Sequence, residues 1–239
     1  MPELIYGEAR ITYEVVISLR RATVGITVYP DKRVVVHAPR KSASTWLEQV
    51  VQSKARWILK QLSAMEAMPR ERREFVSGEC FSLLGQSYGL EVSLDDLPRP
   101  EAKLAADRLV VLLPRELCPE QHAQNVRNAL ERWYLAQAKA VLPSRVEAFS
   151  PLVGKQPAKV AVRNQQHRWG SCSSTGNINL NWRIVMAPLP VVDYVAAHEV
   201  CHLQVPNHSP AFWSLLGTVL PGYPAPREWL KVNGHKLAF

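Results

Sequence analysis

A histidine motif late in the chain constrains the fold more than any other feature. Residues 198–202 read His-Glu-Val-Cys-His, and His208 follows six residues later. Residues four apart lie on the same face of an α-helix, so one helix can present His198 and His202 to a single metal ion. Apolar residues dominate 191–197, which predicts that this helix is buried.

Burial of these polar side chains needs an explanation. An unpartnered polar group in a protein core costs several kcal/mol, and a bound metal ion would remove that cost for the histidines. Glu199 lies about 100° round the helix from His198. It can therefore reach a water molecule beside the metal without being a ligand itself.

A third histidine extends the motif. We expect the helix to end near Gln204 and the next helix to begin at Ser209-Pro210, a pair typical of helix starts. His208 would then be held in the short turn between the two helices. The sequence therefore predicts a metal site formed by His198, His202 and His208.

Composition and charge narrow the class of protein. The chain has 239 residues, 47% of them hydrophobic, which is enough for a sizeable core. Its four cysteines form no C-x-x-C pair, its N-terminal stretch lacks a signal pattern, and no apolar run could span a membrane. These features predict a cytoplasmic protein with reduced thiols and no membrane partner.

The net charge of +8 permits contact with phosphates, so a nucleic acid or nucleotide partner is possible on this ground. Basic residues occur in pairs, as at Arg20-Arg21 and Arg72-Arg73. They are scattered and mixed with glutamates, however, which favours an ordinary solvated surface.

The first part of the chain is expected to be mostly β. Three strands are predicted at 11–19, 23–29 and 33–38, arranged as an antiparallel meander. A helix should follow over 44–65, with Trp46 and Trp57 in its buried apolar stripe. Further short strands are expected between residues 75 and 113.

The second part should begin with another long helix. Pro119 opens it, and its apolar stripe continues to at least Val141, while Pro143 is expected to kink or end it. A strand at 159–162 and a hairpin with a turn at 174–177 then precede the histidine helix.

These elements predict an α+β fold in two regions. Residues 1–115 would form an N-terminal region of mostly antiparallel β-strands with one long helix. Residues 116–239 would form a metal-binding catalytic domain, in which the histidine helix lies beside a β-hairpin.

Several short motifs together carry a family resemblance: Arg168-Trp169-Gly170-Ser171-Cys172, Asn181-Trp182-Arg183, Asp193-Tyr194-Val195, the 198–202 motif, Asn207-His208-Ser209 and Phe212-Trp213. With them the chain resembles the YgjP-like family of zinc-dependent metallopeptidases and metal-dependent hydrolases, which is related to SprT-like and other zincins. The resemblance implies a zincin-like second half, zinc on His198, His202 and His208, and Glu199 as the catalytic glutamate.

The chemistry of such a site can be stated in advance. Three neutral histidines leave one zinc ion per chain an open coordination position. Glu199 would act as general base toward a water molecule. A group that stabilises the oxyanion is also needed, and Arg168, His167 and Tyr194 are the nominees.

The hairpin is the predicted substrate platform. A strand edge that could pair with an extended peptide is expected at Trp169, Gly170 and Ser171. Arg168 and Tyr194 are two further candidates for contact with the substrate. Gly170 would allow a close approach of the substrate backbone.

Three functions follow, in order of preference. The first is a zinc metallopeptidase that cleaves peptide or protein substrates. The second is a metal-dependent hydrolase of nucleotide phosphoanhydrides, although the chain has no glycine-rich phosphate loop. The third is a nucleic-acid-associated binding protein or protease. A His₃ site also accepts Ni²⁺, Co²⁺ or Mn²⁺, so the sequence leaves the native metal open.

Overall fold

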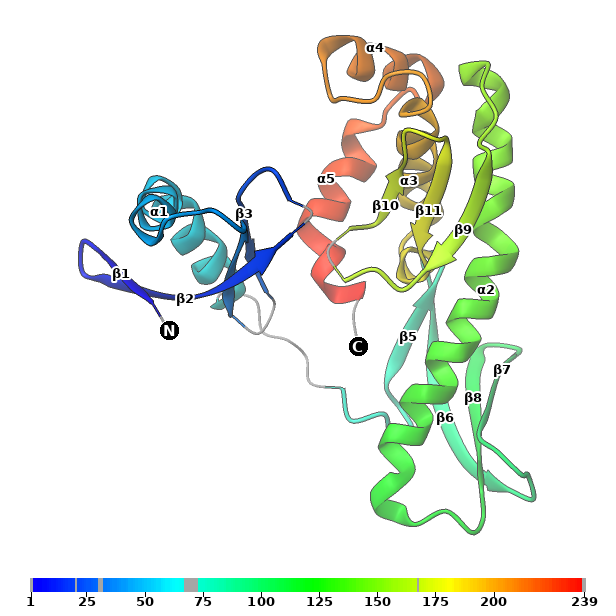
Figure 1. Cartoon of the computed structure of the whole chain (residues 1–239). Coiled ribbons are helices and arrows are strands. Elements are labelled where there is room, and N and C mark those ends of the chain that lie inside the picture. The colour runs from blue at the N-terminus through cyan, green and yellow to red at the C-terminus, as the bar shows by residue number, and fades with distance from the viewer. Residues whose placement is uncertain (1, 20, 30–31, 67–72, 167, 238–239) are drawn as a thin grey trace. The chain divides into compact units, whose positions relative to one another are not determined.

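The chain forms two compact units, which span 1–71 and 72–239. The computed structural model describes residues 2–19, 21–29, 32–66, 73–166 and 168–237. Within these residues it contains three β-sheets and five α-helices, so the predicted α+β class is confirmed (Figure 1). Each unit has its own hydrophobic core.

The first unit is one sheet with one helix. Its elements are β1 (Glu3–Tyr6), β2 (Ala9–Ser18), β3 (Gly25–Val28), β4 (Val34–Pro39) and α1 (Ser44–Glu66). The strand order is β1-β2-β4-β3, and β2 and β4 run parallel. The predicted antiparallel meander is therefore wrong. The apolar β4 has the most buried residues of the four strands. It lies between β2 and β3, so a strand covers each of its two edges.

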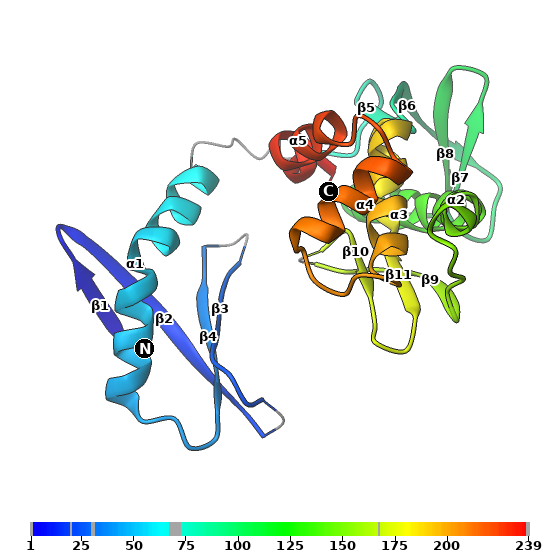
Figure 2. The same ribbon diagram turned by 90° about the horizontal axis from the view of Figure 1, so that it is seen from above.

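Helix α1 covers one face of this sheet (Figure 2). Its buried stripe consists of Leu47, Val51, Ala55 and Ile58. Trp46 and Trp57 were predicted to belong to the stripe, but their exposed fractions are 46% and 44%. They lie next to stripe residues in sequence, so they are turned about 100° away from the sheet.

The second unit contains two sheets and four helices. Its first sheet has the order β5-β6-β8-β7 and its second the order β10-β11-β9. The elements are β5 (Cys80–Leu83), β6 (Gln86–Asp95), β7 (Glu101–Ala105), β8 (Arg108–Pro114), α2 (His122–Val153), β9 (Lys159–Arg163), β10 (Gly170–Cys172), β11 (Asn177–Asn181), α3 (Leu189–Cys201), α4 (Pro210–Val219) and α5 (Pro224–Asn233). Short 3₁₀ turns lie at Pro119–Gln121, Trp182–Met186 and Gly234–Leu237.

Helix α2 is the common support of this unit and runs past both sheets (Figure 1). The sequence predicts that Pro143 kinks or ends this helix, but α2 continues to Val153. Gly154 follows it with a left-handed backbone (φ of 71°), which ends the helix. Pro143 cannot donate a hydrogen bond to the carbonyl of Lys139. Lys139 is exposed, so water can satisfy that carbonyl.

The strands β5–β8 belong with α2. The fully buried Tyr134 of α2 donates a hydrogen bond to the carbonyl of Ser82 on β5, at 2.8 Å, and its ring lies in the same core as the strands. The two compact units divide between residues 71 and 72, whereas the sequence interpretation placed its boundary at residue 115.

Helix α3 is almost surrounded by apolar side chains, as its sequence predicts. One ion pair fixes it to α2: the Arg145 guanidinium donates two hydrogen bonds to the Asp193 carboxylate. The predicted hairpin next to α3 is confirmed, because β10 and β11 pair antiparallel. Strand β9 adds to β11 in parallel and leaves β10 at an edge of the sheet. None of the helices in the described part of the chain is both long and apolar enough to cross a membrane.

Candidate metal centre

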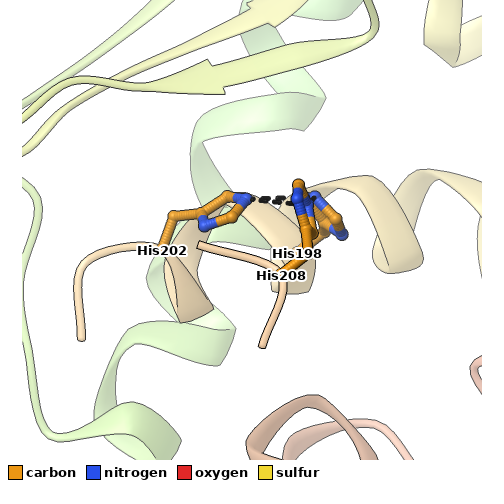
Figure 3. Close-up of side chains that lie close together, drawn as sticks. All are labelled: His198, His202 and His208. Atoms are coloured by element: carbon orange, nitrogen blue, oxygen red, sulfur yellow. Dashed lines mark hydrogen bonds between the residues drawn. The ribbon is translucent and has the colours of Figure 1, made fainter. Parts of the chain in front are cut away.

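Three histidine side chains converge at the C-terminal end of α3 (Figure 3). His198 lies in the last turn of the helix, His202 follows its last residue, and His208 lies in the segment before α4. The Nε2 atom of His202 is 3.2 Å from that of His198 and 3.2 Å from that of His208. The Nε2 atoms of His198 and His208 are 2.9 Å apart. The helix ends at Cys201, three residues before the predicted end, so His202 begins the turn that brings His208 back.

Local contacts orient these rings. Nδ1 of His202 is 3.0 Å from the carbonyl oxygen of Val205, so this nitrogen carries the proton and Nε2 presents a lone pair to the other rings. The indole N–H of Trp213 donates to the carbonyl of His208 at 3.2 Å, which holds the third histidine in place. The buried Nδ1 of His198 has no hydrogen-bond partner among the described residues.

Phe212 forms the floor of the cluster. It is fully buried, and its ring centre lies 4.9 Å from that of His198, 4.5 Å from that of His202 and 4.9 Å from that of His208. Burial, together with the neighbouring charges of His202 and His208, lowers the pKa of His198 to about 3. Burial also lowers the pKa of His202. His198 and His202 therefore resist protonation and keep their nitrogen lone pairs available.

This donor set fits a divalent transition metal. Neutral imidazole nitrogens are preferred ligands of zinc, and Zn–N bonds of about 2.0–2.1 Å at tetrahedral angles separate the nitrogens by about 3.3–3.4 Å. The observed separations of 2.9–3.2 Å are slightly shorter. Three nitrogens this close on an apolar floor, one of them with its lone pair facing inward, are more readily explained by a shared cation than by hydrogen bonds among themselves.

Glu199 follows His198 in α3, and its side chain lies against β10. Its exposed fraction is 5%, and the backbone of Gly170 passes directly against it: a Cβ atom on Gly170 would lie 2.5 Å from Oε1. Burial raises the pKa of Glu199 to about 8, although the positive charge of Arg168 opposes the shift. A buried carboxyl group with a raised pKa is suited to accepting and returning a proton near neutral pH.

Of the other predicted site residues, Tyr194 has a direct contact with the histidines. Tyr194 is one turn before His198, with ring centres 5.7 Å apart, and burial raises its pKa. Ser171 lies on β10, where its hydroxyl accepts a weak hydrogen bond from Gln165. Trp169 packs against Gly234, so its ring supports the fold of the C-terminal segment. The predicted oxyanion candidate His167 lies outside the described residues.

The sequence interpretation missed a layer of side chains next to His208. Trp213 stacks on His208 with 5.6 Å between ring centres, and Tyr223 stacks on Trp213 at 5.8 Å. The guanidinium carbon of Arg227 lies 4.3 Å from the centre of the Trp213 ring. Trp213 could have been suspected from its place in the Phe-Trp pair after His208. Nothing in the local sequence connects Arg227 on α5 with the histidines.

Comparison with known proteins places this chain in a family. A sequence model described as the YgjP-like metallopeptidase domain matches residues 22–233. The chain belongs to the YgjP-like family. The predicted resemblance is thus confirmed, and a YgjP-like metallopeptidase domain implies a metal cofactor, for which the three histidines form a suitable group.

One solved structure is similar to part of this YgjP-like chain. It is the metallopeptidase zymogen of Pyrococcus abyssi abylysin, with 21% sequence identity and a TM-score of 0.36 over 39% of this chain and 94% of that one. A comparison with proteins of curated function finds no match.

Proposed function

We propose that the YgjP-like chain is a zinc-dependent metallopeptidase, with zinc held by His198, His202 and His208 and with Glu199 as general base. The observation that carries this proposal is the convergence of three imidazoles, the first of which is followed in the chain by a buried carboxyl group. In this proposal α3 and the β10–β11 hairpin form the catalytic half of a zincin. The family match to a metallopeptidase domain supports it.

In the proposed reaction Glu199 moves the protons. A zinc ion bound to the histidines would supply Lewis acidity, which polarises an oxygen of the substrate and makes water easier to deprotonate. Glu199 accepts a proton from the attacking water and returns it to the amine that leaves. Its buried position against Gly170 keeps the carboxyl group in one orientation for both steps.

The edge of β10 is the proposed peptide-binding platform. The N–H of Asn181 donates to the carbonyl of Trp169, which makes 169 and 181 a hydrogen-bonded pair of the hairpin. Pairs alternate in an antiparallel ladder, so the N–H and C=O of Gly170 point toward the unpaired side. An extended peptide could add there as a further strand, with its backbone next to Glu199. Arg168 and Tyr194 are proposed to contact the side chains of this peptide.

Metal analysis combined with hydrolysis assays tests the proposal. Wild type should contain about one zinc per chain, and His202→Ala should lose it. Glu199→Gln should keep the zinc and lose at least 100-fold in peptide hydrolysis, because only the general base is removed. Full activity of Glu199→Gln, or a zinc-free wild type after incubation with zinc, would refute the mechanism.

The same assay separates peptidase activity from nucleotide hydrolysis. Nucleoside triphosphates are incubated with the same zinc-loaded preparations. Nucleotide turnover that depends on Glu199 while no peptide is cleaved would replace the peptidase proposal with the phosphoanhydride one. The described residues offer no specific observation in favour of a nucleic-acid-binding role.

A further inference from the structure

The side chain of Arg227 is held close to the histidines by a stack of rings. Its guanidinium lies on Trp213, and Trp213 stacks on His208. Trp213 also donates its indole N–H to the carbonyl of His208. Arg227 is therefore held on the ring that supports the third histidine.

No acidic side chain in the described part of the chain lies within 4.0 Å of this guanidinium. Its neighbour Glu228 pairs with Lys231 at 3.1 Å. Asp193, the other acidic residue of α3 besides Glu199, is held by both hydrogen bonds from Arg145. Arg227 is exposed, so its N–H donors face solvent and are available to a ligand.

The surroundings of Arg227 favour an anion. Neither α4 nor β10 contains a charged residue. On the β10 side of the site, Arg168 brings a second positive charge, since it lies two residues before that strand. Since Glu199 is buried, an approaching substrate meets two arginines and no exposed, unpaired carboxylate from α3, α4 or β10.

We propose that Arg227 recognises a carboxylate of the substrate, so that the enzyme prefers peptides with an acidic group near the scissile bond. A guanidinium offers two parallel N–H donors that match the two oxygens of a carboxylate, and stacking on Trp213 fixes its plane in advance. This inference rests on the proposed peptidase function, since it names the substrate class of the same site. The carboxylate can belong to a Glu or Asp side chain or to the C-terminus of the peptide.

The test measures binding in the Glu199→Gln background, so that no turnover is needed. The probes are fluorescein-labelled alanine octapeptides with a blocked C-terminus and one Glu at successive positions, each paired with its Gln counterpart. A third set has no Glu and a free C-terminus. Fluorescence anisotropy with zinc-loaded protein gives the dissociation constants, and far-ultraviolet circular dichroism and zinc content verify each variant.

We expect at least one Glu peptide, or the free C-terminus, to bind about tenfold more tightly than its uncharged counterpart. Arg227→Gln should reduce this ratio to about one, and Arg227→Lys should keep part of it because the charge remains. Lys236→Gln removes a charge shortly after α5, from a side chain that contacts Asn233 and no carboxylate among the described residues, and should leave the ratio unchanged. The set that shows the preference tells a side-chain carboxylate from a C-terminal one.

If every charged peptide binds as tightly as its uncharged counterpart, the inference is overturned. This outcome needs no Arg227 variant. A preference that survives Arg227→Gln overturns it too, as does a lack of binding by every peptide. The two proposals fail separately. If wild type cleaves peptides without regard to charge, the peptidase function stands and the role of Arg227 falls. If the Arg227-dependent preference is present but wild type cleaves no peptide, the role of Arg227 in carboxylate binding stands and the peptidase function falls.

Discussion

Gly170 and Glu199 are in such close contact that there is no room for a side chain on the glycine. A Cβ atom at position 170 would lie 2.5–2.7 Å from three atoms of the Glu199 side chain, including Oε1. Real Cβ atoms essentially never lie within 3.0 Å of such neighbouring atoms. The strand β10 therefore acts as a wall that sets the position of the carboxyl group.

Gly170→Ala should displace Glu199 while leaving the three histidines in place. We expect peptide hydrolysis to fall at least tenfold, zinc content to stay near wild type, and the free energy of unfolding to drop by about 1–3 kcal/mol from overpacking. Gly89→Ala is the matched control, because it also lies in a strand but has no atoms within 4 Å of the added methyl group. Unchanged kcat in Gly170→Ala would show that Glu199 does not need this wall.

Phe212→Leu tests whether the floor under the rings matters for metal binding. The substitution opens a gap beneath all three imidazoles, so we expect the affinity for zinc to fall about 10-fold to 100-fold, the range seen when groups that orient ligands are changed. Competition with a chromophoric chelator measures it. Phe81→Leu, at an equally buried position on β5, should lose stability to a similar degree but keep its zinc affinity. Equal zinc affinity in both variants would contradict a role for the floor.

The ion pair between Arg145 and Asp193 should stabilise the packing of α3 on α2. Replacement of Asp193 by Asn leaves a partly buried guanidinium without its charged partner, and we expect the free energy of unfolding to fall by about 1–3 kcal/mol. Urea denaturation measures the change. Lys231→Met breaks an exposed pair and should cost less than about 1 kcal/mol. A smaller loss in Asp193→Asn than in Lys231→Met would argue against this role.

Glu199 should make the metal-free protein less stable as the pH rises. Its pKa rises from an ordinary value of 4.5 to about 8 in the folded chain because of burial. Between these values the folded state holds a proton that the unfolded state has released, so stability is full below pH 4.5 and is lost as the pH rises toward 8. Glu199→Gln removes this dependence.

Thermal denaturation of the metal-free wild type and of Glu199→Gln, from pH 5 to pH 9, measures the effect. The melting temperature of the variant should exceed that of wild type by an amount that grows with pH. The histidines are common to both proteins, so their titration cancels in the difference. A constant difference across this range would mean that Glu199 is not buried as described.

The parts of the fold set by local patterns could be predicted from the sequence. The apolar periodicity of α1 gave this helix nearly its observed bounds, and the hairpin predicted before the histidine helix is present as β10 and β11. The spacing of His198, His202 and His208 brought the histidines together because all three lie within one short stretch.

Contacts between distant segments could not be predicted in this way. The parallel pairing of β2 with β4 depends on which strand has the most apolar surface and therefore takes a central place in the sheet. The pattern of a single strand does not show this, because the strands have to be compared with one another. Pro143 stays inside α2 because the carbonyl that it leaves free is at an exposed position, which only the packed helix reveals. Arg227 reaches the histidines through Trp213, from another helix, and carries no local signal.

The three histidines all follow the sheets and the long helix in chain order, and this has a consequence for biosynthesis. As the ribosome makes the chain, β5 to β11 and α2 are synthesised before the first of the histidines. Each new segment can then pack on structure that already exists. A nascent chain thus lacks all three side chains of the proposed metal site until the elements that support them have been made. Any metal capture at this site, and any activity that depends on it, is therefore delayed to a late stage of synthesis.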